Sequence, residues 1–364
     1  MEDSIFITGY PGFLAQNLVE QIIKDHGQTI QNIYLLVLPK EMEKAQIELN
    51  HFTSRTATDR NIFTIVPGDI TKTGLGMIEE TAKEIENSVT HLFHLAAIYD
   101  LAVPESLAYE VNVHGTKLVT EWARKITQLK RYVYFSTAYV SGTREGRIYE
   151  TELQMGQSFK NHYERTKYEA EIIVEKAKVD LPTTIIRPGI VRGHSQTGET
   201  TKFDGIYFML NLFDRLALSP VLPYLGDGHV EGNFVPVDYV LKASSYLAFQ
   251  KVGIGKTYHL TDPEPYSMRQ LYQMLAESYL GREPKGQISL ELASLPLNFS
   301  NIKKWLKVEK EALAYFKIDS SYDCTQAVTD LKDADIVCPD FKVSIYSMID
   351  FYRKYKHDYN KHIL

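Results

Sequence analysis

Two side chains that can move a proton and hold a charge stand four residues apart, at Tyr163 and Lys167. On a helix, positions i and i+4 share one face, so the phenol and the ammonium are expected to point into one pocket. A nearby positive charge stabilises phenolate and lowers a pKa that is about 10 in model compounds. The spacing therefore predicts a tyrosine that can act as an acid or base near neutral pH. A second copy, Tyr352 and Lys356, lies in a basic segment near the C-terminus, and we interpret it as chance.

A hydroxyl group is expected close to this pair. The apolar run that ends at Phe135 is followed by the letters STAYVSG, which places Thr137 directly after a predicted strand. The carboxyl ends of parallel strands share one edge of a sheet, where ligands of such sheets bind. Thr137 is therefore a candidate for contacting a substrate, and capping of the strand end is the alternative interpretation.

The first residues predict a strand, a tight turn and a helix. Residues 4–7 are mostly apolar, Gly9 and Gly12 permit a turn with close backbone approach, and residues 16–24 repeat apolar side chains at helical spacing. A helix that begins after such a turn directs backbone N–H groups and the positive end of its dipole at an anion. Ala15 stands where a third glycine is usual in dinucleotide-binding turns. The pattern predicts a pyrophosphate site, and an ordinary glycine-containing loop is the alternative.

Strands alternate with helices through the first half of the chain. We predict strands at 33–38, 62–66, 91–95, 132–136 and 183–187, separated by helices at 40–50, 76–87, 106–127 and 161–178. This alternation is typical of an α/β fold with a parallel sheet wound on both sides. We expect a nucleotide-binding domain over 1–190, with segments around 230–262 returning to it, and a smaller, mixed, interleaved substrate-binding region over 191–364.

Composition excludes several classes of protein. The chain has 364 residues with a net charge of −6, which argues against a general nucleic-acid binder. No apolar run approaches the roughly 18 residues of a membrane span, and the first strand begins without a signal peptide, so we expect a cytoplasmic protein. Two cysteines, Cys324 and Cys338, make neither a disulfide framework nor a metal site, and we expect free thiols and no bound metal.

Seven segments together resemble one superfamily. They are, in chain order, TGYPGF, the GDI at 68–70, the HLAA at 94–97, the NVHGT at 112–116, STAYVSG, YERTK and the RPGIV at 187–191. Their order and spacing are similar to those of the extended short-chain dehydrogenase/reductases. The resemblance covers about residues 4–260 and implies a Rossmann-type domain with a catalytic Thr137, Tyr163 and Lys167.

The resemblance also implies a role for each matched residue. Thr137 would hydrogen-bond the substrate oxygen, Tyr163 would exchange the proton, and Lys167 would hold the nicotinamide ribose. Asn112 would support the proton path, with a buried amide satisfied by backbone as the alternative; Asp69 would meet the adenine, with a helix N-cap as the alternative. The implied cofactor-binding residues are Thr8, Gly9, Tyr10, Pro11, Gly12, Phe13, Leu14, Lys40, Asp69, Ile70, Ala96, Ala97, Tyr163, Lys167, Pro188, Gly189 and Val191.

Cofactor preference is where the sequence departs from these relatives. Members that prefer NADP usually carry an arginine after the second strand, but this chain reads LVLPK at 36–40. No acidic residue stands at the strand end, and the carboxylate that usually selects NAD is not visible until Glu41. Lys40 could supply positive charge to a 2′-phosphate, with Lys44, Arg55 or Arg60 as helpers. We therefore favour NADPH over NAD, and the alternative for Lys40 is a solvent-facing loop lysine.

Within the superfamily the chain is most similar to the fatty acyl-CoA reductases and thioester reductase domains. The likeness rests on STAYVSG, the IVRGHSQTGE at 190–199, the FVPVDYV at 234–240 and the C-terminal segment from 322. It implies reduction of an acyl thioester, CoA- or carrier-bound, to aldehyde or alcohol. The apolar residues between 203 and 225 form either an acyl channel or the core of the smaller region.

Two other functions stay open, and a homodimer is possible. A nucleotide-sugar epimerase or dehydratase could use the same fold, although the dehydratase Asp-Glu pair is absent after Thr137, where Ala138 and Tyr139 follow. A non-catalytic dinucleotide sensor is the other alternative, which an intact Thr137, Tyr163 and Lys167 disfavour.

Overall fold

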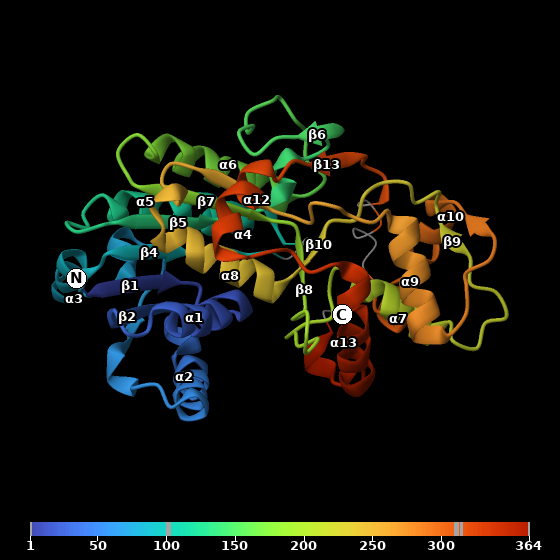
Figure 1. Ribbon diagram of the computed structural model, residues 1–364, viewed down its shortest axis with the longest axis horizontal. Helices are drawn as coiled ribbons and strands as arrows, with labels where there is room; N and C mark the ends of the chain where they lie inside the picture. The colour runs from blue at the N-terminus through green and yellow to red at the C-terminus, as the bar shows by residue number, and fades with distance from the viewer. Residues whose placement is uncertain (1, 100–102, 309–312, 314–315, 363–364) are drawn as a thin grey trace.

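Seven parallel strands form the central sheet of the computed structural model, which describes residues 2–99, 103–308, 313 and 316–362. The strand order is β11-β7-β5-β4-β1-β2-β3 (Figure 1). The strands are β1 (Asp3–Thr8), β2 (Ile30–Val37), β3 (Phe63–Pro67), β4 (His91–His94), β5 (Arg131–Phe135), β7 (Thr183–Pro188) and β11 (Thr257–Leu260). The predicted doubly wound α/β fold is confirmed, because the chain reverses its winding direction between β1 and β4.

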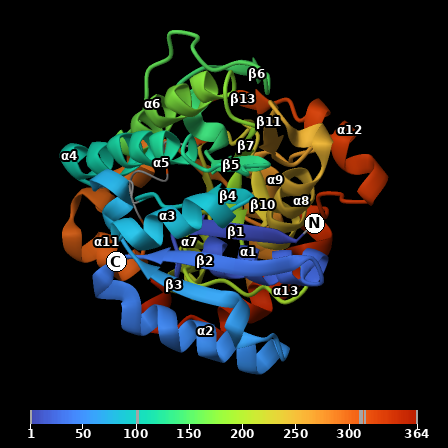
Figure 2. The same ribbon diagram turned by 90° about the vertical axis from the view of Figure 1, so that its left-hand side faces the viewer.

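Helices cover both faces of this sheet (Figure 2). One face packs against α1 (Phe13–His26), α2 (Met42–Thr56) and α8 (Val237–Phe249), and the other against α3 (Glu79–Ser88), α5 (Thr116–Ala123) and α6 (His162–Ala177). Each face has its own apolar core: the first core packs under α1, α2 and α8, and the second under α3, α5 and α6. Along β1, Ile5 and Ile7 belong to the first core and Phe6 belongs to the second. This two-sided burial explains why the strands are nearly continuous apolar runs.

The predicted helix at 106–127 is wrong in its interior. The chain forms α4 (Glu105–Ala108), then a π-helical segment at Tyr109–Gly115, and then α5. In this π-helical segment, the Asn112 side chain makes two hydrogen bonds with the backbone of Ile98. Its Oδ1 accepts from the Ile98 N–H at 2.8 Å, and its Nδ2 donates to the Ile98 carbonyl at 3.0 Å. Such segments are frequent at functional sites.

A third apolar core lies beyond the sheet, at the end of the molecule where α7, α9 and α13 gather (Figure 1). These helices are α7 (Tyr207–Arg215), α9 (Met268–Leu280) and α13 (Phe341–Tyr355). Most apolar residues between 203 and 225 are buried in this core, whereas Leu218 is 99% exposed and Val221 56% exposed. Core packing is therefore the better interpretation of this stretch.

Short parallel strand pairs lie outside the central sheet. The strand pairs are β8 (Ile190–Arg192) with β10 (Phe234–Pro236), β9 (Tyr224–Leu225) with β12 (Gln287–Ile288), and β6 (Gly146–Ile148) with β13 (Ser320–Tyr322). The remaining α-helices in the described residues are α10 (Leu290–Ser294), α11 (Ser300–Leu306) and α12 (Thr325–Leu331). Cys324 and Cys338 are free thiols, as predicted. Over the described ranges, no helix combines the length and apolarity needed to cross a membrane.

Candidate active site

The predicted binding residues follow the carboxyl ends of adjacent strands. Thr8 ends β1, and its Oγ1 accepts hydrogen bonds from the amides of Leu95 (3.2 Å) and Ala96 (3.1 Å) after β4. This bond holds the two strand ends together where the winding direction reverses. In order along the sheet edge, Asp69 and Ile70 follow β3, Lys40 follows β2, Gly9 to Leu14 follow β1, Ala96 and Ala97 follow β4, Thr137 follows β5, and Pro188, Gly189 and Val191 lie at the end of β7 and in β8.

The glycine turn is shaped for close backbone approach. The Gly12 amide donates to the Gly9 carbonyl at 2.8 Å, and Gly9 has φ +92°. A Cβ on Gly9 would lie 2.8 Å from the Ala96 nitrogen, and a Cβ on Gly12 would lie 2.7 Å from the Gly9 oxygen. The turn leads directly into α1, whose first turn has no acidic residue and no side-chain cap among the described residues. These uncapped N–H groups fit an anionic pyrophosphate.

Tyr163 lies in the first turn of α6, where Asn161 caps the helix by accepting from the Glu164 amide at 2.9 Å. The Thr137 hydroxyl at the end of β5 lies near the Tyr163 phenol and favours its ionised form. Burial has the larger effect and raises the pKa of Tyr163 to about 12. The predicted lowering of this pKa is therefore wrong, because desolvation outweighs the effect of the nearby hydroxyl.

Lys167 is buried, 3% exposed, on the same helix. Its ammonium donates to the Phe135 carbonyl at 2.6 Å and lies 4.4 Å from the centre of the Tyr134 ring. Burial lowers the pKa of Lys167 to about 7, and the negative charge of Glu171 opposes this. The helix thus brings Tyr163 and Lys167 to the end of β5, beside Thr137.

Asn112 braces this arrangement from the π-helical segment. Besides its two bonds to Ile98, its Nδ2 donates to the Thr166 hydroxyl at 3.0 Å, and the Thr166 hydroxyl in turn donates to the Tyr163 carbonyl at 3.1 Å. The side chain is 1% exposed. Asn112 therefore connects the loop after β4 with the turn that carries the phenol.

The residues predicted to contact the adenosine half of the dinucleotide are less tightly grouped than Thr137, Tyr163 and Lys167. Asp69 Oδ1 accepts from the amide (2.9 Å) and hydroxyl (2.8 Å) of Thr71, so it shapes the turn after β3. Lys40 is exposed beyond β2. Arg55 is engaged by Glu20 at 2.6 Å, and Arg60 donates to a backbone carbonyl. Lys44, in the first turn of α2, is exposed as well.

The second Tyr-Lys pair serves the core of the smaller region. The Tyr352 hydroxyl donates to Asn211 at 2.9 Å, and Lys356 pairs with Asp214 at 2.6 Å. These contacts fasten α13 to α7. They account for the pair without a role in acid–base chemistry.

A polar network under the site was missed from the sequence. Glu171 follows Lys167 by one helical turn and is paired with Arg187 on β7. Ser136, the residue before Thr137, donates to the other carboxylate oxygen of Glu171. The i+4 spacing of Lys167 and Glu171 was the available signal.

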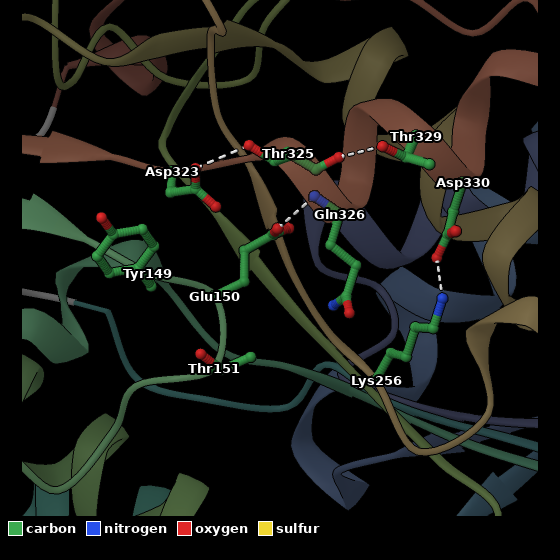
Figure 3. Close-up of a pocket in the computed structure, with 9 residues that line it drawn as sticks. All are labelled: Tyr149, Glu150, Thr151, Lys256, Asp323, Thr325, Gln326, Thr329 and Asp330. Atoms are coloured by element: carbon green, nitrogen blue, oxygen red, sulfur yellow. Dashed lines mark hydrogen bonds and ion pairs between the residues drawn. The ribbon is translucent and has the colours of Figure 1, made fainter.

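A separate polar cavity of about 350 Å³ lies beside the outer strand β11 (Figure 3). It is lined by Glu150, Lys256, Gln326 and Asp330 among others, and by none of the predicted site residues. The Glu150 carboxylate accepts from two backbone N–H groups at the start of α12, those of Gln326 at 2.7 Å and Ala327 at 3.1 Å. Lys256 pairs with Asp330 at 2.6 Å on the same helix. These contacts dock α12 against the sheet.

Comparison with known proteins identifies the family. Residues 7–244 match the model of a family of NAD-binding domains described as male sterility protein. The chain belongs to this family. Its resemblance to the extended short-chain dehydrogenase/reductases, and to their fatty acyl-CoA and thioester reductases, is confirmed.

Two curated relatives are named as different kinds of protein. The fatty acyl-CoA reductase wat of Drosophila melanogaster is 26% identical over 279 residues, covering 66% of this chain and 53% of the relative. The nonribosomal peptide synthetase cpsA of Aspergillus campestris is 26% identical over 296 residues, covering 76% of this chain and 28% of the relative. The chain therefore spans about half the length of the first and under a third of the second.

Solved structures show the same fold. The terminal R domain of the myxalamid PKS-NRPS pathway has a TM-score of 0.79 at 24% identity, covering 97% of this chain and 91% of that one. UDP-glucuronic acid 4-epimerase from Bacillus cereus, solved with NAD, has a TM-score of 0.64 at 17% identity, covering 96% and 99%. At these identities the likeness concerns the fold alone.

Proposed function

We propose that this protein reduces an acyl thioester, held by coenzyme A or by a carrier protein, to an aldehyde or alcohol with NADPH. The observation that carries the proposal is the grouping of Tyr163, Lys167 and Thr137 at the end of β5, at the same sheet edge as the glycine turn. Support for the substrate class comes from the family and from relatives named as fatty acyl-CoA reductases.

The chemistry follows from the positions of three side chains. A reduced nicotinamide dinucleotide, when bound, supplies the hydride to the carbonyl carbon. The Thr137 and Tyr163 hydroxyls donate hydrogen bonds to the carbonyl oxygen as negative charge develops there. With a thioester, the C–S bond would then break, the carbonyl would re-form as the aldehyde, and the thiolate of coenzyme A or the carrier would leave. Reduction of the aldehyde to the alcohol would take a second hydride from a second reduced dinucleotide, and Tyr163 would give its proton to the oxygen. Lys167, whose ammonium lies at the end of β5, would hold the nicotinamide ribose and so orient the dinucleotide relative to Tyr163.

NADPH is proposed over NADH because of Lys40. It is the exposed cation directly after β2, where the ribose 2′ position lies in such folds. No acidic side chain stands at the end of β2 to select the unphosphorylated ribose.

The proposal is tested by following NADPH absorbance with purified protein. A medium-chain acyl-CoA should cause oxidation of NADPH, whereas a UDP- or dTDP-sugar should not. Sugar conversion without net oxidation of the cofactor would instead establish the epimerase alternative. Lack of reaction with either substrate, together with tight NADPH binding, would favour the sensor alternative.

Tyr163→Phe removes the hydroxyl and leaves the ring. We expect turnover to fall by roughly 10²- to 10⁴-fold, the usual contribution of general acid catalysis and oxyanion stabilisation. NADPH binding, measured by fluorescence, should change little. Unchanged turnover would remove Tyr163 from the mechanism.

A further inference from the structure

A buried ion pair lies one helical turn below the candidate active site. Glu171 on α6 is fully buried, and its Oε1 accepts from Arg187 Nε at 2.9 Å and Nη2 at 2.5 Å. Its Oε2 accepts from the Ser136 hydroxyl. Both oxygens of one carboxylate are thus used, one by β7 and one by the end of β5.

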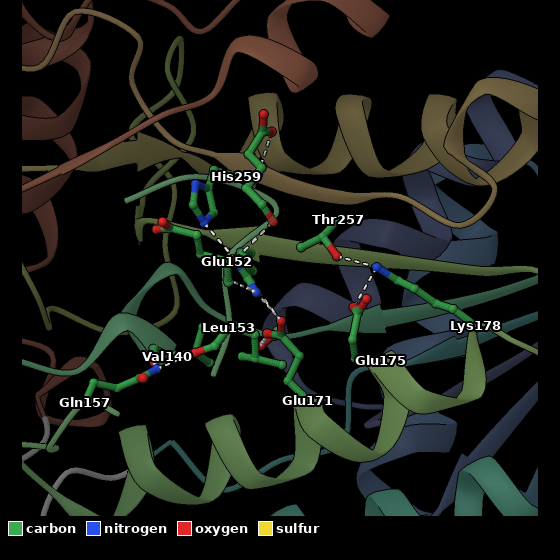
Figure 4. A network of polar contacts seen from close by, with 12 residues as sticks. Val140, Glu152, Leu153, Gln157, Glu171, Glu175, Lys178, Thr257 and His259 are labelled. Carbon is green, nitrogen blue, oxygen red and sulfur yellow. Dashed lines mark hydrogen bonds and ion pairs between the residues drawn. The ribbon is translucent and has the colours of Figure 1, made fainter. Parts of the chain in front are cut away.

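The arginine is held by several fixed acceptors, among them Glu152, Glu171 and His259, which are labelled in Figure 4. Arg187 donates to the carbonyls of Glu150 at 3.3 Å and Glu152 at 2.9 Å, and to His259 Nε2 at 3.1 Å. Burial and the Arg187 charge lower the pKa of His259 to about 3, so this ring is neutral and its Nδ1–H donates to the Asp323 carbonyl at 2.7 Å. Since the guanidinium is fixed, the Glu171 carboxylate that it binds is fixed as well.

Glu171 faces the active site in two ways. Through Ser136 it anchors the residue that precedes Thr137, and along α6 it lies four residues from Lys167. The titratable and charged groups around Lys167 are Tyr163 and Glu171 on α6, His94 on β4 and Tyr134 on β5, with Arg187 on β7 behind Glu171. In this set Glu171 is the group whose negative charge favours the ammonium form of Lys167.

We propose that Glu171 is a positioning residue of the reaction proposed above. It holds Ser136, and thereby the Thr137 hydroxyl, at the end of β5, and it places a carboxylate one helical turn from the buried Lys167 ammonium. The inference rests on the proposed function for its catalytic half, whereas its effect on Lys167 concerns dinucleotide binding alone.

Glu171→Gln keeps the size of the side chain and removes the charge. Lys167 should then lose its proton at a lower pH, because burial is no longer opposed. We expect the midpoint of the pH dependence of NADPH affinity, measured by fluorescence between about pH 5.5 and 9, to move down by about one unit. Affinity above the new midpoint should fall by up to about tenfold, with little change at low pH.

Glu175→Gln is the matched control. Glu175 lies one turn further along α6 and pairs with Lys178 at 2.6 Å, with 42% of its side chain exposed. Glu175→Gln should keep the wild-type pH midpoint of NADPH affinity. Glu171→Asp retains the charge, so its midpoint should lie closer to that of the wild type than the midpoint of Glu171→Gln does. A purely structural ion pair would weaken binding equally at every pH, and either that result or an unchanged profile would overturn the proposed charge effect.

Ser136→Ala tests the positioning half and leaves the Arg187–Glu171 pair in place. We expect kcat for thioester reduction to fall by roughly tenfold or more, as for a displaced oxyanion donor, while NADPH affinity is unchanged. An unchanged kcat would overturn the positioning role. If Glu171→Gln does not fold, the Ser136→Ala variant decides whether Glu171 positions Thr137 through Ser136. If the wild type binds NADPH and reduces no thioester, the proposed function fails, while the pH profiles still decide the role of Glu171 at Lys167.

Discussion

Replacing Arg187 by methionine should destabilise the protein strongly. Arg187 is 1% exposed and Glu171 is fully buried, so the variant leaves a carboxylate without its cationic partner in the interior. Among the described residues, the hydrogen bond from Ser136 is the one that remains to this carboxylate. Breaking a buried ion pair in this way costs about 3–5 kcal/mol. The free energy of unfolding of a typical domain is about 5–15 kcal/mol, so the loss is a large fraction of it.

The assay is equilibrium unfolding in urea, with the wild type and variants compared at one pH. Arg124→Met is the matched control, because Arg124 pairs with Asp180 at 2.6 Å while their side chains are 42% and 47% exposed. An exposed pair of this kind contributes about 0–1 kcal/mol. The double variant Arg187→Met with Glu171→Gln should be less destabilised than Arg187→Met alone, since the unpaired charge is gone.

Two outcomes would refute this reasoning. One is a loss for Arg187→Met no larger than that for Arg124→Met. The other is a double variant that loses the sum of the two single effects, because strict additivity would mean that the two side chains do not interact. A changed urea dependence would have to be excluded first, since it signals altered compactness and not altered stability.

Three further predictions concern other parts of the fold. Gly9→Ala should lower the unfolding temperature more than Gly156→Ala does. Both glycines have positive φ, but a Cβ on Gly9 would lie 2.8 Å from the Ala96 nitrogen, whereas a Cβ on Gly156 would meet open space. Equal shifts of the unfolding temperature would contradict this. Lys40→Ala should weaken NADPH binding by roughly three- to tenfold and leave NADH binding unchanged in fluorescence titrations, and equal effects on both would exclude a contact with the 2′-phosphate. Burial raises the pKa of Glu150 from 4.5 to about 7, so its contribution to stability is present below 4.5 and lost as the pH rises through about 7. The unfolding free energy of the wild type relative to Glu150→Gln should therefore fall between these pH values, and a constant difference would refute the shift.

The sheet was predictable because its signals are local. Each strand is a short apolar run rich in β-branched and aromatic residues, and the order of motifs limits how such strands can be wound. The interior of the predicted helix at 106–127 was not predictable in the same way. Its irregular turn depends on a contact between Asn112 and the backbone of Ile98, which lies outside the helix.

In the candidate site, too, the residues set by local spacing were predictable and the contacts between distant segments were not. Spacing alone placed Tyr163 and Lys167 on one face of a helix, and the structure puts both at the end of β5. The partners of Glu171 come from two strands, and its salt bridge with Arg187 forms only after β7 has joined the sheet. Sequence spacing carries no measure of burial, and for that reason the direction of the Tyr163 pKa shift was predicted wrongly.

That reversal bears on the direction of the proposed reaction. Burial raises the pKa of Tyr163 to about 12 and lowers that of Lys167 to about 7. Near neutral pH the phenol therefore keeps its proton, and Lys167 gives up its own proton more readily than Tyr163 does. A protonated phenol is the form that can donate to an oxyanion, as reduction of a carbonyl requires, whereas oxidation of an alcohol would require the phenolate. Because Glu171 favours the Lys167 ammonium, the same side chain that fixes Ser136 also raises the protonated fraction of Lys167 one helical turn from Tyr163. A neutral phenol at this position therefore suits donation to the carbonyl oxygen in the proposed reaction.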